Sequence, residues 1–123
     1  MTLSRSLILL ALLPGAVAPA QTPAAAGVGQ GAVVTLYAQA CASCHGPDMV
    51  GGRAPSLLDD VWTFGGDDAS VALSIREGRA AGAMPSFKAL LTDQQIRDVL
   101  AYIESQWPPE TAMRQRAAGH PRF

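Results

Sequence analysis

The chain has 123 residues, of which 49% are hydrophobic and 15% are charged, and its formal net charge is −1. This composition is typical of a single compact domain and excludes a disordered tail or a multidomain enzyme. Its basic residues form no patch of the kind that follows a phosphate backbone, which argues against nucleic acid as a partner.

The first twenty residues have the pattern of an export signal. Arg5 supplies a positive start, residues 7–13 form an unbroken apolar run, and Ala18-Pro19-Ala20 matches the small-x-small cleavage pattern. The alternative is an uncleaved membrane anchor, but a spanning helix needs about 20 apolar residues and this run is shorter. We therefore expect residues 1–20 to be a cleaved signal, the protein to be periplasmic, and no stable membrane insertion.

The mature chain is expected to begin with a flexible leader. Residues 21–30 are rich in Ala, Gly and Pro and carry no charge, so the domain is placed at residues 31–107. From Gly31 the apolar residues recur at helical spacing, which predicts a first helix that leads directly into Cys41. Repeated Pro and Gly then predict a loop over residues 46–56.

Two further helices are predicted. A short one runs from Asp68 to Glu77, with Asp67 as its N-cap and Gly78 as its stop. The last helix starts at a capping box, Thr92-Asp93-Gln94-Gln95, carries an apolar stripe that extends to Trp107, and ends before two prolines.

The predicted fold class is all-α, a small domain of three to four helices with long loops. No segment alternates apolar and polar residues over a strand's length. Residues 108–123 are polar and lean basic, and they are predicted to form a loosely ordered tail.

The strongest chemical signal is Cys41-Ala42-Ser43-Cys44-His45, the C-x-x-C-H arrangement of covalent haem attachment. Two thiols three positions apart on a helical turn can reach the two vinyl groups at one edge of a haem. The next residue places its imidazole under the iron. We therefore predict one haem c, bound through two thioethers, with His45 as the proximal ligand.

Other functions of the two cysteines are weaker alternatives. A thioredoxin-like motif would lie in a βαβ pattern, and the sequence shows none. A zinc site would need two more ligands, but the sequence has no further cysteine and its only other histidine is His120. A structural disulfide is possible in an exported protein but leaves His45 unexplained.

Met84 is the leading candidate for the sixth iron ligand. It lies in Gly82-Ala83-Met84-Pro85, far enough along the chain to return over the opposite haem face, and Pro85 favours an extended backbone before it. Met49 follows His45 closely and is expected to be a loop or packing residue. Met113, His120 and an open site are the alternatives.

The chain resembles the class I cytochromes c over roughly residues 33–107. In that family the first and last helices cross beside the haem, and a proline carbonyl, here matched by Pro55, accepts a hydrogen bond from the proximal histidine. The family usually has glycine where this chain has Val33, so the crossing is expected to be wider or slightly shifted. The resemblance is carried by Tyr37, the haem motif with Gly46, Ala54-Pro55-Ser56-Leu57, Gly82-Ala83-Met84-Pro85-Ser86-Phe87 and Ala101-Tyr102-Ile103.

A weaker resemblance is to the cytochrome modules of bacterial respiratory oxidase subunits and of periplasmic quinoprotein dehydrogenase chains. It includes Arg53, Trp62 and the Gly78-Arg79 pair. Arg53 and the Trp62 indole N–H are candidates to pair with the haem propionates, which need partners when buried. The alternatives are a solvated loop cation and a core aromatic residue, and Arg79 is expected at the surface.

The resulting expectation is a periplasmic one-electron carrier without a catalytic site of its own. Its partners would be redox proteins, with a periplasmic dehydrogenase as donor and an oxidase or another cytochrome as acceptor. The chain is expected to act as a monomer or in transient complexes. The alternatives are a haem sensor with an open sixth site and a cytochrome subunit tightly bound to a dehydrogenase.

Overall fold

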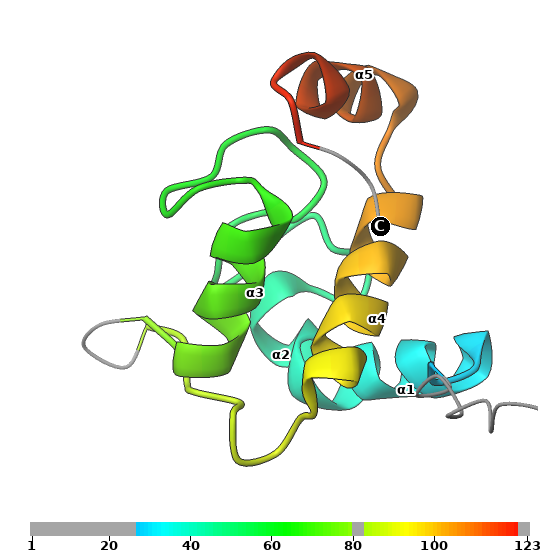
Figure 1. The fold of residues 1–123 in the computed structure, drawn as a ribbon, viewed down its shortest axis with the longest axis vertical. Helices are drawn as coiled ribbons and strands as arrows, with labels where there is room; N and C mark the ends of the chain where they lie inside the picture. The colour runs from blue at the N-terminus through cyan, green and yellow to red at the C-terminus, as the bar shows by residue number, and fades with distance from the viewer. Residues whose placement is uncertain (1–26, 80–82, 121–123) are drawn as a thin grey trace, which may run out of the picture.

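The computed structural model describes residues 27–79 and 83–120, and the predicted signal at residues 1–20 lies outside them. The described part is all-α, as predicted, and contains no strand, only one isolated bridge between Arg79 and Met84. Figure 1 shows α3 and α4 side by side with α2 behind them, and α5 beyond the end of α4. The helices are α1 (Gln30–Ala40), α2 (Ala42–His45), α3 (Asp68–Glu77), α4 (Asp93–Ser105) and α5 (Pro109–Ala117).

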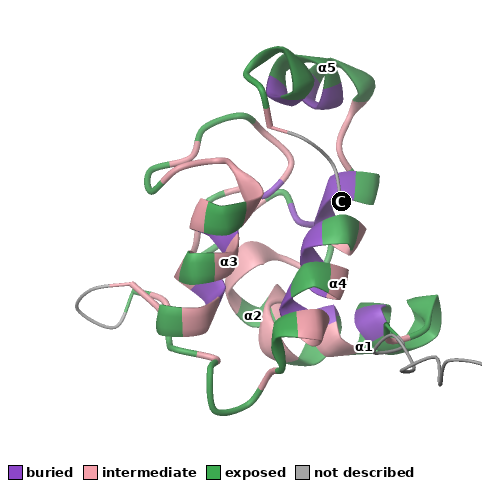
Figure 2. Ribbon diagram, viewed as in Figure 1, coloured by how far each residue is buried: buried purple, intermediate pink, exposed green. Residues whose placement is uncertain are grey.

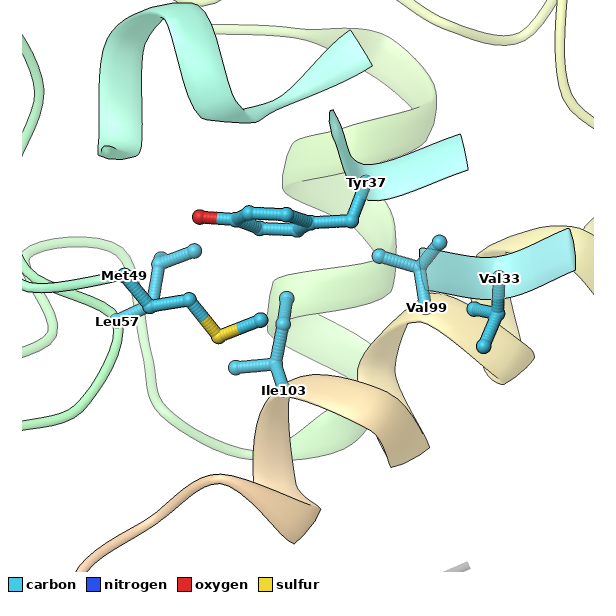
Figure 3. Packing of buried hydrophobic residues seen from close by; sticks show 6 residues of the cluster. All are labelled: Val33, Tyr37, Met49, Leu57, Val99 and Ile103. Atoms are coloured by element: carbon cyan, nitrogen blue, oxygen red, sulfur yellow. The ribbon is translucent and has the colours of Figure 1, made fainter. Parts of the chain in front are cut away.

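The first buried cluster lies where α1 packs against α4 (Figure 3). Tyr37 contributes its ring to this cluster and donates its hydroxyl to the Gly46 carbonyl over 2.7 Å, which ties the first helix to the loop after the haem motif. Val33 is itself buried here, so the crossing accommodates a side chain at this position. The cluster consists of Val33, Tyr37, Met49, Leu57, Val99 and Ile103.

The second buried cluster joins α3 to α4. Figure 2 shows buried positions on the sides of these two helices that face each other. The cluster consists of Val71 and Ile75 on α3 and Ile96 and Leu100 on α4. Trp62, in the loop before α3, packs against both clusters. The apolar stripe of α4 therefore packs against both α1 and α3, because successive residues of the stripe belong alternately to the first and the second cluster.

The predicted starts of α3 and α4 are confirmed, whereas α4 ends at Ser105, before the predicted stripe reaches Trp107. The Asp67 carboxylate accepts the backbone N–H of Ser70 at the start of α3, and hydrogen bonds from Ser70 hold the pKa of this carboxyl below its usual range. At the start of α4, the Thr92 hydroxyl accepts from the Gln95 N–H while the Gln95 side chain accepts from the Thr92 N–H at 2.9 Å. Both caps satisfy N–H groups that the helix itself leaves unbonded.

We predict that Thr92→Ala destabilises the folded protein by about 1 kcal/mol, because it removes the hydroxyl side of this capping box. Denaturant unfolding of the natively matured protein measures the effect. Thr92→Ser keeps the hydroxyl and is the matched control, expected to retain most of the stability. Equal losses in the two variants would show that the cap hydrogen bond is not the cause.

Helix α5 was not among the predicted elements. It starts after Pro108 and buries Thr111, Ala112 and Gln115 within the segment that had been expected to be a loosely ordered tail. Proline at the first helical position suits a helix start, because its missing N–H has no intrahelical partner there. The division into leader, domain and tail otherwise stays a prediction. Within the predicted leader, the Val28 N–H donates to the Asp98 carboxylate of α4 at 2.8 Å.

Over residues 27–79 and 83–120, none of the helices has both the length and the apolar character needed to cross a bilayer.

Candidate functional site

The two cysteines and His45 occupy one helical turn. Cys41 ends α1 and also precedes α2, and its carbonyl accepts the N–H of Cys44 at 3.1 Å and that of His45 at 3.0 Å. These bonds fix the spacing of the two thiols and the imidazole along the turn.

The loop after this turn orients the imidazole. His45 Nδ1 lies 2.9 Å from the Pro55 carbonyl oxygen, which can only accept, so Nδ1 carries the proton in this contact and Nε2 is left as a lone-pair donor. The loop doubles back tightly, since the Gly51 N–H bonds the His45 carbonyl at 3.0 Å. Gly51 has φ of +101°, and a Cβ on it would lie only 3.0 Å from the Ser56 nitrogen. Glycine is therefore required for the path that brings Pro55 to His45.

Met84 is held near the end of α3 by backbone contacts. The Arg79 N–H donates to the Met84 carbonyl over 2.9 Å, which closes the isolated bridge between these residues. Gly78 has φ of +74°, and a Cβ there would approach the same carbonyl oxygen to 2.7 Å. The glycine that ends α3 is thus also the residue that lets the Met84 segment pack closely against it.

An apolar cavity of about 270 Å³ joins these parts. Its wall includes six of the seven predicted site residues: Cys41, Cys44, His45, Pro55, Trp62 and Met84. Arg53 is exposed and does not line the cavity, so the structure does not bring it together with the others. Aliphatic and aromatic side chains complete the wall, namely Leu57, Val61, Phe64, Val71, Ile75, Phe87, Val99 and Ile103.

Arg79 is a cavity residue, and its expected surface position is wrong. It is only partly exposed, its Nε donates to the Ser74 hydroxyl at 2.9 Å, and its guanidinium lies 4.6 Å from the centre of the Phe64 ring. It is therefore the cation that the structure places at the cavity wall. Its only signal in the sequence was its position in the Gly78-Arg79 pair.

The other candidates for an iron ligand lie elsewhere. Met49 is buried in the first cluster, as expected of a packing residue, and Figure 3 shows its thioether among Tyr37, Leu57 and Ile103. Met113 is 64% exposed on α5, and His120 bonds the Gln115 side chain beside a second, polar cavity. Of the four residues, only Met84 shares a cavity wall with His45.

The electrostatics of the thiols do not favour thiol redox chemistry. Burial, with a smaller effect of the neighbouring Cys44, raises the pKa of Cys41 to about 11, so this thiol stays protonated at neutral pH. Reactive cysteines of thioredoxin-like motifs instead have a lowered pKa. A metal cluster is also unsupported, because no three His, Cys, Asp or Glu side chains gather within the described ranges.

Comparison with known families gives a match over residues 31–103 to the family described as cytochrome c oxidase, cbb3-type, subunit III. The chain belongs to this family. The match begins in α1 and ends in α4, so it contains the two-cysteine turn, the Pro55 loop, Trp62 and Met84 and leaves α5 outside.

Curated relatives carry the corresponding names. A cbb3-type cytochrome c oxidase subunit CcoP of Cereibacter sphaeroides is 43% identical over 72 residues, which cover 56% of this chain and 24% of that protein. The CcoP subunit of Rhodobacter capsulatus is 41% identical over 80 residues, covering 57% and 27%. The FixP subunit of Azorhizobium caulinodans is 35% identical over 91 residues, covering 72% and 29%. The chain thus spans about a quarter of the length of these relatives.

Membership in the cbb3 subunit III family makes this chain a class I c-type cytochrome domain, an electron carrier rather than an enzyme, whose cofactor is haem c. The residues present fit that group. Two unlinked thiols, a histidine with a free Nε2 and a methionine share one apolar cavity. In addition, Nε1 of Trp62 is buried and has no hydrogen-bond partner among the described residues, as expected for a donor whose acceptor is a bound group.

Proposed function

We propose that this chain is a periplasmic one-electron carrier. Haem c supplies a reversible one-electron couple between ferric and ferrous iron. Cys41 and Cys44 would hold it through two thioethers, and His45 and Met84 would supply the two protein ligands of the iron. The observation that carries the proposal is that the C-x-x-C-H turn and Met84, which are separated by half the domain in sequence, line the same apolar cavity.

The surrounding residues would tune the two ligands. The Pro55 carbonyl keeps the proton on Nδ1 of His45 and makes Nε2 a stronger donor. Met84 contributes a soft, neutral thioether that favours the ferrous state and so raises the potential. The Trp62 indole N–H and the Arg79 guanidinium, both at the cavity wall, are proposed to face the haem propionates. A contact between Arg53 and a propionate stays a prediction from the sequence, because Arg53 does not line the cavity.

The partners follow from the family rather than from the geometry. The relatives are named as subunits of a cbb3-type oxidase, so an oxidase of that kind is the proposed electron acceptor, directly or through another cytochrome. A periplasmic dehydrogenase is the proposed donor. Redox encounters of this type bury small interfaces, under about 1,200 Å², which is compatible with a monomer that docks transiently.

The absorption spectrum of the natively matured protein tests the assignment. We expect the bands of a covalent haem c, together with the weak far-red band of methionine–ferric ligation. Carbon monoxide should bind the reduced protein poorly. Rapid carbon monoxide binding without the far-red band would instead indicate a haem sensor with an open sixth site. A colourless protein would contradict the proposed function altogether.

A further inference from the structure

The C-terminal segment bonds the loop before Trp62 at three positions. The Trp107 indole N–H donates to the Leu57 carbonyl at 2.9 Å, and the Thr111 hydroxyl donates to the Leu58 carbonyl at 2.9 Å. Arg114 then pairs with the Asp60 carboxylate at 2.7 Å. Residues 57–60 are thus bonded to a segment that lies about fifty positions further along the chain.

These contacts differ in strength. Thr111 is 2% exposed, so its hydroxyl bond to the loop is protected from water and costly to lose. The Arg114–Asp60 pair is half exposed on both sides, and ion pairs of that kind contribute about 0–1 kcal/mol. Thr111 is therefore expected to matter most, with Arg114 adding to it.

Trp62 follows this loop directly and lies between two cavities. It lines the apolar cavity of the haem motif, and it also lines the polar cavity formed with Arg114, Gln115 and His120 of the C-terminal segment. Its indole edge is close to Gly66, where a Cβ would come within 2.7 Å of ring carbon Cδ1. A small displacement of the loop would therefore move a closely packed ring.

We propose that helix α5 is a positioning element for the haem site, with Thr111 and Arg114 as positioning residues. By bonding residues 58 and 60, they hold the Trp62 indole so that its buried Nε1–H meets a carboxylate of the bound haem. The inference rests on the proposed function, and it goes beyond the family match, because both residues lie after position 103. It assigns a role in the redox site to helix α5, although no residue of α5 lines the apolar cavity of the haem motif.

The test uses the two indole N–H signals of the reduced, natively matured protein, since the chain has two tryptophans. Thr111→Val/Arg114→Ala removes both bonds, and valine keeps the shape of the buried threonine. We expect hydrogen exchange at Trp62 Nε1–H to accelerate about tenfold, the scale set by losing a bond to a charged group. The reduction potential should also fall, because a carboxylate without its donor stabilises ferric iron.

Matched controls are available in the same chain. Thr35→Val/Arg116→Ala removes a threonine and an arginine whose side chains, among the described residues, bond carbonyls of their own helices at 2.9 and 3.0 Å. This variant should keep the Trp62 exchange rate and the potential of the natural protein. Thr111→Ser/Arg114→Ala keeps a hydroxyl at position 111. Its Trp62 exchange rate and reduction potential should therefore be close to those of the natural protein.

Two outcomes would overturn the inference. One is a test variant that unfolds more easily but keeps the Trp62 exchange rate and the potential, which would make α5 merely stabilising. The other is a Trp62 indole N–H that already exchanges freely in the natural protein although haem is attached. That result would leave the proposed function intact, whereas a protein that binds no haem would end both.

Discussion

Replacing both Cys41 and Cys44 by alanine is expected to abolish covalent haem attachment completely. Each thiol lies at the cavity wall on the same helical turn, and no other cysteine is present in the chain to take over. Any haem that the variant retains should be extracted into acidified acetone, whereas the natural protein should keep its haem under the same treatment. The pigment left on the polypeptide after extraction measures the difference.

The same variant should also lose much of its stability. The apolar cavity between the two buried clusters has no protein atoms to fill it, and unfilled apolar volume in a domain of about a hundred residues is costly. Loss of a ligand that binds only the folded state lowers stability further.

Ser43→Ala is the matched control for this change. Ser43 lies between the two cysteines and is exposed, so this variant keeps both thiols and should mature normally. Haem that resists extraction in the double cysteine variant would contradict the thioether assignment. A cooperative, well-protected fold in the haem-free protein would contradict the role of the haem in the core.

Met84→Ala is expected to remove the far-red absorption band and to lower the reduction potential. A thioether favours ferrous iron, and axial ligands set haem potentials over a range of about 0.8 V, so the shift should be a large part of what the site can tune. The reduced variant should also gain carbon monoxide binding, because the sixth position becomes open. Spectra and potentiometric titration measure both effects.

Met113→Ala is the matched control, since it removes the same side chain from an exposed position on α5. It should leave the spectrum and the potential unchanged. An unchanged far-red band in Met84→Ala would instead transfer the ligand role to another residue. Loss of the band in Met113→Ala would contradict the placement of that residue away from the cavity.

Local signals predicted the helices well. Asp67, Gly78 and the capping box at Thr92 each act within one turn of the chain, so their effect on the backbone does not depend on distant residues. The exception is α5, whose residues are polar and carry little apolar periodicity. Its helix is stabilised by contacts with the loop at residues 57–60, which no local pattern reveals.

The positions of side chains at the site depend less on local signals. His45 and Met84 were predicted as ligands because a haem motif needs a neighbouring histidine and a distant soft ligand, and the structure places both at one cavity wall. Arg53 and Arg79 could not be told apart by chemistry, since both are loop or helix-end arginines in matched segments. Only the tertiary structure shows that Arg79 reaches the cavity wall and Arg53 does not.

The sequence by itself determined which cofactor to expect, because two cysteines followed by a histidine in C-x-x-C-H spacing are the pattern of covalent haem attachment. The tertiary structure decided which distant groups meet that turn: the Pro55 carbonyl at His45, Met84 across the cavity, and the C-terminal helix behind Trp62. These pairings depend on how glycine-rich loops fold back over long separations, where no local preference acts and packing selects the path.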